Sequence, residues 1–393
     1  MKVLVSNVGS TSLKFKLFDM PAETVLCEGK VERVGSEADA IFSYRNPDAG
    51  FSVTEEGLSI PTYTDGILRF LGHMTDREHG AVADVGEIGA VGFKTVLSRD
   101  HYGDHELTEE VLQGMRDYLV VAPAHNGPYL EAIGQFKKIL PDARMVGAFE
   151  TAFHTTIPLE NRLYAVPYEW YEKYGVMKMG YHGASHSFIA SQVGGGKVIS
   201  CHLGGSCSLC AIDDGRSIDS SFGFSLQTGI PHSTRVGDAD MFLIPFMESR
   251  GMDREEIYRQ LSKNSGLLGI SGVSGDFRHV QEAMEAGDPR AALAIDVFVT
   301  ALVRTIGAFY AELGGLDTLV FTGGIGEHSP LVRERVCRRL AHLGVRLDEA
   351  KNNACTGGGV ISADDSPVRV LAIPANEELG VARRTVAVLE KNG

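Results

Sequence analysis

The chain has 393 residues, of which 44% are hydrophobic and 22% are charged, and its formal net charge is −14. A single hydrophobic core rarely grows this large, so we expect two domains. The negative charge argues against a nucleic-acid-binding protein, because such proteins cluster Lys and Arg to displace counterions from phosphates. The N-terminus lacks a basic segment followed by an apolar one, and we expect no later apolar run to be long enough to span a bilayer. These features predict a cytoplasmic protein without membrane or nucleic-acid partners.

Residues 2–19 predict a hairpin of two apolar strands joined by a turn of Gly and Ser. The backbone N–H groups of such a turn can approach an anion closely. Asn7, Ser10 and Ser12 add polar side chains, and Lys14 adds a positive charge. The segment therefore suits a phosphate, although an ordinary hairpin turn explains the same residues when this copy is considered alone.

Strand-like and helix-like patterns then alternate. Residues 90–97 predict a buried strand, residues 107–119 an amphipathic helix, and residues 145–149 a second buried strand. Glu150 follows the second strand and offers a carboxylate in a turn. This alternation is typical of an α/β fold.

Residues 197–213 predict a second hairpin with a similar Gly/Ser turn. Aligning Ser10 with Ser206 gives an offset of 206 − 10 = 196 positions, about half of the chain. We therefore predict duplication into two similarly folded halves, with the active site in a cleft between them. Cys207 and Cys210 form a C-x-x-C pair inside this strand pattern. Because no second pair follows, we expect reduced thiols and neither a metal nor a redox site.

Four other turns combine glycines with polar side chains. In residues 180–186 glycines flank an imidazole, and residues 233–238 place an arginine in a turn. Residues 271–278 end in charged side chains, and residues 319–327 predict a strand that ends in a Gly-rich turn. A purely structural role is the alternative to a functional one for these residues. The histidines would then only hydrogen-bond backbone groups of their turn, and the arginine would form a surface ion pair with Asp238.

The last third of the chain predicts two further helices and a strand before the C-terminal helix. Residues 289–313 predict a long, largely apolar helix, which we expect to be buried between domains, in a subunit interface or in an ordinary core. Residues 331–343 predict another helix, and residues 368–373 the last strand. The final helix, through Leu389, starts near Glu377, whose carboxylate can cap the helix.

These segments fit phosphoryl transfer, which needs positive groups around the migrating oxygens, a carboxylate to hold Mg²⁺ and little covalent chemistry. In their order and spacing, the segments resemble the acetate kinase family of carboxylate kinases, within the sugar kinase/heat-shock ATPase/actin superfamily, from residue 2 to about residue 388. The resemblance is carried by the motifs N-x-G-S-x-S-L-K-F, G-Y-H-G-x-S-H, H-L-G, T-R-x-G-D, G-V-S-G-D-F-R, G-G-I-G-E and N-E-E-L.

The resemblance implies an α/β fold with a duplicated RNase-H-like architecture, in which two domains enclose an interdomain cleft. Residues 1–150, completed by the C-terminal helix 377–393, form the first domain, and residues 151–376 form the nucleotide-binding and dimerisation domain. The implied reaction is reversible phosphorylation of acetate or a related short-chain carboxylate to an acyl phosphate. It uses ATP and Mg²⁺, proceeds by direct in-line transfer, and takes place in a homodimer.

The resemblance also implies roles by position. The catalytic residues are Lys94, Glu150, His182 and Arg235, and the metal ligands are Asn7 and Glu377. The acceptor carboxylate is expected to contact Lys94, Val96, Ala124, Tyr181 and Arg235. The nucleotide and its phosphates are expected to contact Asn7, Ser10, Ser12, Lys14, His202, Gly204, Gly205, Ser206, Asp276, Phe277, Arg278, Gly323, Gly324, Ile325, Gly326 and Glu327.

Three stretches depart from the family pattern. The family has H-R-V-V-H-G-G-E where residues 93–100 are F-K-T-V-L-S-R-D, so Lys94 replaces an arginine that in the family contacts the acceptor and the phosphoryl group. A lysine keeps the charge but lacks the planar, two-pronged geometry. Glu150 replaces the usual aspartate, and Gly205 and Ser206 replace the usual Asn and Gly.

These departures leave alternatives open. The site acts on another carboxylate or uses another phosphoryl donor such as pyrophosphate, or the chain is a non-catalytic, nucleotide-binding regulatory homologue. We favour a working kinase that uses ATP, because the turn at residues 323–327 retains an adenosine pocket. The charged side chains that are retained include Lys14, His182, Arg235, Asp276, Arg278 and Glu377. Arg99 either supplies the missing guanidinium or is a surface arginine.

Overall fold

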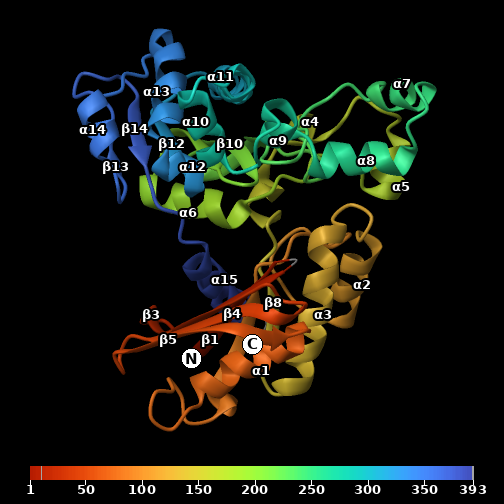
Figure 1. Ribbon diagram of the computed structural model, residues 1–393, viewed down its shortest axis with the longest axis vertical. Helices are drawn as coiled ribbons and strands as arrows, with labels where there is room; N and C mark the ends of the chain where they lie inside the picture. The colour runs from red at the N-terminus through yellow and green to blue at the C-terminus, as the bar shows by residue number, and fades with distance from the viewer. Residues whose placement is uncertain (10, 392–393) are drawn as a thin grey trace. The chain divides into compact units, whose positions relative to one another are not determined.

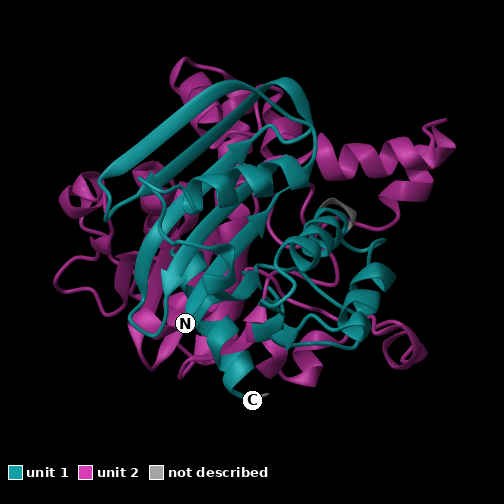
Figure 2. Cartoon of the chain, turned by 90° about the horizontal axis from the view of Figure 1, so that it is seen from below, with its two compact units in different colours: residues 1–152, 376–393 teal, residues 153–375 magenta. Residues whose placement is uncertain are grey.

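The computed structural model describes residues 1–9 and 11–391, and at residues 123 and 124 it describes the backbone only. The chain forms two compact units, residues 1–152 with 376–393 and residues 153–375 (Figure 2). Each unit has its own mixed β-sheet with helices packed against it (Figure 1). The structure is therefore α/β, as the sequence predicts.

The sheet of the first unit has eight strands in the order β5-β4-β3-β2-β1-β6-β8-β7. Strands β1 to β5 form antiparallel pairs, whereas β6 is parallel to β1 and β8 is parallel to β6. The strands are β1 (Lys2–Val8), β2 (Ser12–Asp19), β3 (Thr24–Glu32), β4 (Ser36–Asn46), β5 (Phe51–Ile60), β6 (Ile88–Phe93), β7 (His105–Glu106) and β8 (Arg144–Gly147).

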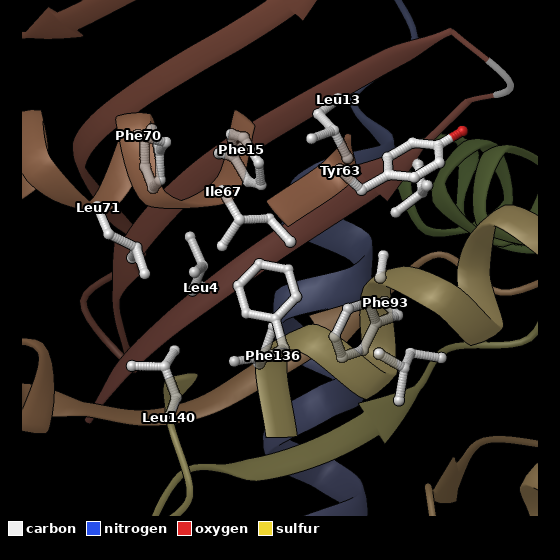
Figure 3. Close-up of a cluster of buried hydrophobic side chains, with 14 of the residues drawn as sticks. Leu4, Leu13, Phe15, Tyr63, Ile67, Phe70, Leu71, Phe93, Phe136 and Leu140 are labelled. Atoms are coloured by element: carbon white, nitrogen blue, oxygen red, sulfur yellow. The ribbon is translucent and has the colours of Figure 1, made fainter. Parts of the chain in front are cut away.

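Helices cover both faces of this sheet. The helices of the unit are α1 (Tyr63–Met74), η1 (Val85–Glu87), α2 (Glu109–Asp117), α3 (Pro123–Ile139) and α15 (Glu377–Lys391). On one face, Phe15 of β2 stacks on Phe70 of α1 with ring centroids 4.5 Å apart, in a cluster that includes Phe136 of α3 (Figure 3). On the other face, Val381 of α15 packs in a cluster with Val5 of β1. Alternate residues of β1 thus enter two cores.

The sheet of the second unit repeats the plan, in the order β11-β10-β9-β12-β14-β13. In this sheet β9 and β10 are antiparallel, β12 is parallel to β9, and β14 is parallel to β12. This matches the arrangement of β1, β2, β6 and β8, so the predicted duplication is confirmed. The strands are β9 (Lys197–Leu203), β10 (Cys207–Asp213), β11 (Arg216–Ser220), β12 (Thr318–Thr322), β13 (Gly359–Val360) and β14 (Arg369–Ala372).

The register corrects the sequence alignment of the two hairpins. Lys2 pairs with Asp19 in the first hairpin, and Lys197 pairs with Asp213 in the second. The offset is therefore 195 on the first strand and 194 on the second, rather than 196 throughout, because the second turn is one residue shorter. By this register, Lys14 corresponds to Ser208.

Helix α11 (Pro289–Leu313) has the bounds predicted from the sequence. It is long and apolar enough to span a membrane by length and composition, so our expectation of no such run was wrong. Its buried side chains recur every three or four residues and belong to the hydrophobic core of the second unit, which explains its composition.

The other helices of this unit are α4 (Leu159–Arg162), α5 (Glu169–Tyr174), α6 (Gly183–Val193), α7 (Leu243–Ser249), α8 (Arg254–Lys263), α9 (Gly266–Ser271), α10 (Phe277–Glu285), α12 (Gly323–His328), α13 (Pro330–Arg339), η3 (Ala341–Leu343) and α14 (Glu349–Ala354), and η2 (Ala152–Thr156) starts at the unit boundary.

Two predicted elements differ in the structure. The strand expected at residues 90–97 ends at Phe93, where β6 gives way to an irregular segment. The Gly-rich turn expected after β12 is instead the start of α12. Gly323 has a φ of +74°, and a Cβ there would lie 2.8 Å from the carbonyl oxygen of Leu203. Only glycine fits this abrupt change from strand to helix.

Candidate active site

A cavity of about 570 Å³ opens in the second unit, and its wall includes residues just after β9 and β12. Because His202 of β9 pairs in parallel with Thr322 of β12, the residues that follow the two strands lie at one edge of the sheet. The lining contains seven of the predicted nucleotide-binding residues, Gly204, Gly205, Asp276, Phe277, Arg278, Gly324 and Ile325. Sequence reasoning missed other lining residues, among them Ser233, Thr234, Gln281 and His328.

Asp276 starts helix α10 at the wall of this cavity. Its Oδ1 accepts from the backbone N–H of Arg278 at 2.9 Å, and its Oδ2 pairs with the Arg278 guanidinium at 2.6 Å. The Arg278 hydrogen bond lowers the pKa of Asp276 to about 2, so this carboxylate stays charged. Arg278 keeps 82% of its side chain exposed and can turn toward a bound anion.

The other predicted nucleotide residues of this unit support the cavity from neighbouring positions. His202 Nδ1 lies 2.8 Å from Ser185 Oγ, and Glu327 accepts from the Ala375 N–H at 3.0 Å. Gly323 and Gly326 pack against the backbone of β9 and β12. The hydroxyl of Ser206 is buried and has no hydrogen-bond partner among the described residues.

His182 and Arg235 are held by local contacts in the second unit. His182 precedes α6 with a φ of +58°, and its Nδ1 lies 2.8 Å from Ser208 Oγ. Arg235 Nη1 donates to the carbonyl of Leu226 at 2.6 Å, and burial lowers the pKa of its guanidinium. Asp238 instead accepts from the Gly229 N–H at 2.8 Å. Tyr181, which was predicted to contact the substrate carboxylate, is buried, and its hydroxyl donates to the Phe224 carbonyl at 2.7 Å.

Lys94, Glu150 and Glu377 form a charged cluster in the first unit. Lys94 follows β6, Glu150 follows the parallel neighbour β8, and Glu377 begins α15. Lys94 Nζ lies 2.5 Å from Glu377 Oε2, and these side chains are 17% and 16% exposed. The sequence did not predict this pair.

Burial sets the charge of this cluster. Burial alone lowers the pKa of Lys94, but the charges of Glu150 and Glu377 outweigh that effect and raise the pKa above its usual value. Glu150 is 5% exposed, and neither of its oxygens has a hydrogen-bond partner among the described residues. Burial raises the pKa of Glu150 to about 7, although the ammonium of Lys94 opposes the shift.

The predicted metal ligands offer a small donor set. Asn7 Oδ1 accepts from the Tyr129 hydroxyl at 3.2 Å, and Glu377 is paired with Lys94. Within residues 1–9 and 11–391, no three His, Cys, Asp or Glu side chains gather as a metal site. One or two carboxylates suffice for Mg²⁺ that keeps its waters and binds substrate phosphates, so the residues fit that cation if Glu377 exchanges partners.

The first hairpin presents the predicted phosphate ligands at its turn. The Gly9 N–H donates to the Ser12 carbonyl at 2.8 Å, and Lys14 lies exposed opposite Asn7. Ser10 lies outside the described residues. A Cβ at Gly9 would lie 2.6 Å from Ser12 Oγ, so a larger residue there would displace the Ser12 hydroxyl.

The residues of the first unit that were predicted to contact the substrate carboxylate are less completely described. Val96 is buried two residues after Lys94, whereas the side chain of Ala124 on α3 lies outside the described part. Sequence reasoning also missed Arg384, whose Nη2 donates to the Phe149 carbonyl at 2.5 Å. Arg384 stands seven residues after Glu377, so both residues lie on one face of α15. This spacing could have indicated that Arg384 lies near the predicted site.

The comparisons with known proteins agree with the motifs. Residues 2–383 match the model of the Acetokinase family. The acetate kinase of Bacillus subtilis is 41% identical over 396 residues, which cover 98% of each chain. The crystal structure of Porphyromonas gingivalis acetate kinase has a TM-score of 0.88 at 35% identity and covers 99% of each chain. A propionate kinase from Francisella tularensis has a TM-score of 0.90 at 30% identity, covering 98% of this chain and 99% of that one.

Proposed function

This chain belongs to the acetokinase family, and we propose that it transfers the γ-phosphoryl group of ATP to a short-chain carboxylate, forming an acyl phosphate. The observation that carries the proposal is the 570 Å³ cavity, whose lining combines predicted nucleotide residues with apolar surface from Phe277 and Ile325. Relatives named acetate and propionate kinases support acetate or a slightly longer acid as the acceptor.

The apolar part of the cavity favours ATP over pyrophosphate as the phosphoryl donor. Ligand pockets bind organic groups through apolar walls with a few placed polar groups, and pyrophosphate has no apolar part. Phe277 and Ile325 offer such walls for a base or ribose, and the exposed Arg278 offers charge for phosphates. ATP therefore uses the whole cavity.

We assign charge stabilisation during transfer to Arg235 and His182. In-line phosphoryl transfer spreads negative charge over the migrating oxygens, and preorganised donors lower the barrier. The Arg235 guanidinium supplies paired N–H donors for phosphoryl or carboxylate oxygens. Its donation to a backbone carbonyl orients the group before substrate arrives.

We propose that the pair of Lys94 and Glu377 opens when the substrates bind. Mg²⁺ bound with the nucleotide neutralises phosphate charge, and Glu377 would hold it together with Asn7 and, through water, Glu150. Lys94 then turns its ammonium to the carboxylate of the acceptor. A lysine suits this exchange because its ammonium is a compact charge on a flexible stem, whereas a bidentate arginine gives up two hydrogen bonds at once.

We also propose a homodimer in the cytoplasm, joined through the second unit. Four large apolar side chains, Met241, Phe242, Leu243 and Phe246, lie in or beside α7, and Met241 and Phe242 are 73% and 72% exposed. An exposed apolar patch of this kind is typical of a protein–protein contact.

Hydroxylamine trapping tests the proposed reaction. The purified chain is incubated with Mg²⁺, either ATP or pyrophosphate, and acetate, propionate or butyrate, and hydroxylamine converts any acyl phosphate into a coloured hydroxamate. We expect hydroxamate with ATP and at least one of these acids. A chain that binds ATP but yields no hydroxamate with any acid is the regulatory homologue, and product formation with pyrophosphate alone refutes the ATP assignment.

A further inference from the structure

Serine and histidine side chains alternate between α6 and the β9–β10 hairpin. Ser200 Oγ on β9 lies 2.9 Å from Nδ1 of His186 on α6. The other ring nitrogen of His186, Nε2, lies 2.8 Å from Ser208 Oγ on β10. The same hydroxyl lies 2.8 Å from Nδ1 of His182. The side chains of Ser200, His186 and Ser208 are fully buried. Their hydrogen bonds are therefore made within the protein.

The direction of donation follows from the number of protons. A serine hydroxyl carries one proton and a neutral imidazole carries one N–H. His186 is neutral, because burial holds its pKa well below the usual value. In one direction, Ser200 donates to Nδ1 of His186, and Nε2 of His186 donates to Ser208. Ser208 then has one proton left, and donates it to Nδ1 of His182.

The opposite direction leaves a buried donor without an acceptor. There, Nδ1 of His186 would donate to Ser200 and Ser208 would donate to Nε2 of His186. The Ser200 hydroxyl proton would then have no acceptor, because His186 is its only side-chain hydrogen-bond partner among the described residues. Unpaired buried donors are costly and rare, so the structure favours the first direction.

We propose that Ser208 is a positioning residue that fixes His182 as the tautomer protonated at Nε2. The inference rests on the proposed function, because it concerns the histidine assigned to charge stabilisation. Donation to Nδ1 keeps the proton of a neutral ring on Nε2, where it serves as a hydrogen-bond donor to a phosphoryl oxygen. The ring of His202, with its centroid 4.2 Å from that of His182, restricts the His182 ring further.

NMR spectroscopy of the full-length protein with ¹⁵N-labelled histidine tests this role, because ring ¹⁵N shifts distinguish the tautomers. His182→Gln assigns the signals by their loss. We expect the Nε2–H pattern for His182 in the unmodified protein and a mixed or reversed pattern in Ser208→Ala. Ser208→Thr keeps a hydroxyl and should restore the pattern. Ser217→Ala is the matched control, because Ser217 makes the same kind of contact with His154, at 2.9 Å, and is equally buried.

Kinetics of hydroxamate formation provide the second readout. We expect Ser208→Ala to lower kcat about tenfold with little change in KM for either substrate, which corresponds to about 1.4 kcal/mol. Unchanged His182 shifts in Ser208→Ala overturn the proposal, even if kcat falls. Full activity of His182→Gln overturns the assigned role of His182 instead, and this result is distinct because the ¹⁵N shifts are read without turnover.

Discussion

The two hairpins share one backbone plan but differ in what covers them. Strand β2 exposes Lys14 and partly exposes Lys16, whereas the equivalent residues of β10, Ser208 and Cys210, are fully buried. In the first unit α15 packs on β1, β6 and β8, and Phe18 at the end of β2 joins its cluster, but Lys14 stays exposed and Lys16 half-buried. In the second unit, residues of α6 join Cys210 in one cluster. The same ladder position therefore holds a charge in one unit and a buried hydrogen-bonding group in the other.

An exchange of side chains at equivalent positions should give the largest difference. Cys210→Lys buries an unpaired ammonium and should cost more than about 4 kcal/mol, enough to unfold the second unit. Lys16→Cys loses only a half-buried ion pair with Glu28, at 3.7 Å, and should change stability by less than about 1 kcal/mol. Trp170, the only tryptophan, lies on α5 of the second unit, so its fluorescence during urea unfolding reports on that unit. Similar losses in both variants would contradict the comparison.

Removal of a guanidinium from the second unit should affect catalysis rather than folding. Arg235→Ala should lower kcat by about 10²–10³-fold, because one preorganised donor to a developing charge contributes that much. Among the described residues, the guanidinium of Arg235 hydrogen-bonds only a backbone carbonyl, so the urea midpoint should move little. Arg235→Lys is the control and should recover only part of the rate, since it restores charge without the planar pair of donors. Equal rates for the two variants would show that geometry is unimportant here.

The charged cluster of the first unit predicts a loss of stability. Lys94→Met removes the ammonium whose charge Glu150 and Glu377 share. The change should cost about 2–3 kcal/mol, below the value for fully buried pairs because both partners of the Lys94–Glu377 pair keep some exposure. Lys2→Met is the matched control, because Lys2 forms a more exposed ion pair with Glu87 in the same unit. Mg²⁺ binding, followed calorimetrically with the nucleotide present, should be tighter in Lys94→Met. Weaker binding there would refute the proposed partner exchange.

Much of the fold follows from local sequence patterns. The bounds of α11 and the duplicated hairpin were predictable, because apolar periodicity and turn residues act within a few positions. The departures came where tertiary contacts decide the conformation. The end of β6 at Phe93 coincides with the Lys94–Glu377 pair, whose partners are 283 residues apart in sequence. No local pattern encodes such a contact.

The site divides in the same way. Gly323, at the start of α12, was predictable from a motif, because only glycine permits the close backbone approach there. The link between Ser208 and His182 was not, since it depends on how α6 packs on the sheet. The second hairpin turn is one residue shorter than the first. Sequence alignment did not detect this difference in length, because both turns contain Gly and Ser.

The smallest expected effect is a pH dependence confined to the second unit. Burial, with a further contribution from Arg235, lowers the pKa of His232 to about 3, and its Nδ1 accepts from the Cys207 N–H at 2.9 Å. In the unfolded chain this histidine binds a proton near pH 6.5, so the unfolded state takes up a proton that the folded state refuses until about pH 3. Stability should therefore fall below pH 6.5, by about 2 kcal/mol at pH 5.

Comparison with His232→Asn isolates this contribution. The amide oxygen of Asn can accept from the same backbone N–H but does not titrate, so the variant should lose about 2 kcal/mol less between pH 7 and pH 5 than the unmodified protein. Urea midpoints read from Trp170 at the two pH values supply the comparison. Parallel losses in the two proteins would mean that other groups cause the acid sensitivity. A smaller loss in the variant would assign the acid sensitivity to His232, which is buried against the start of β10. The equivalent strand of the first unit, β2, instead exposes Lys14.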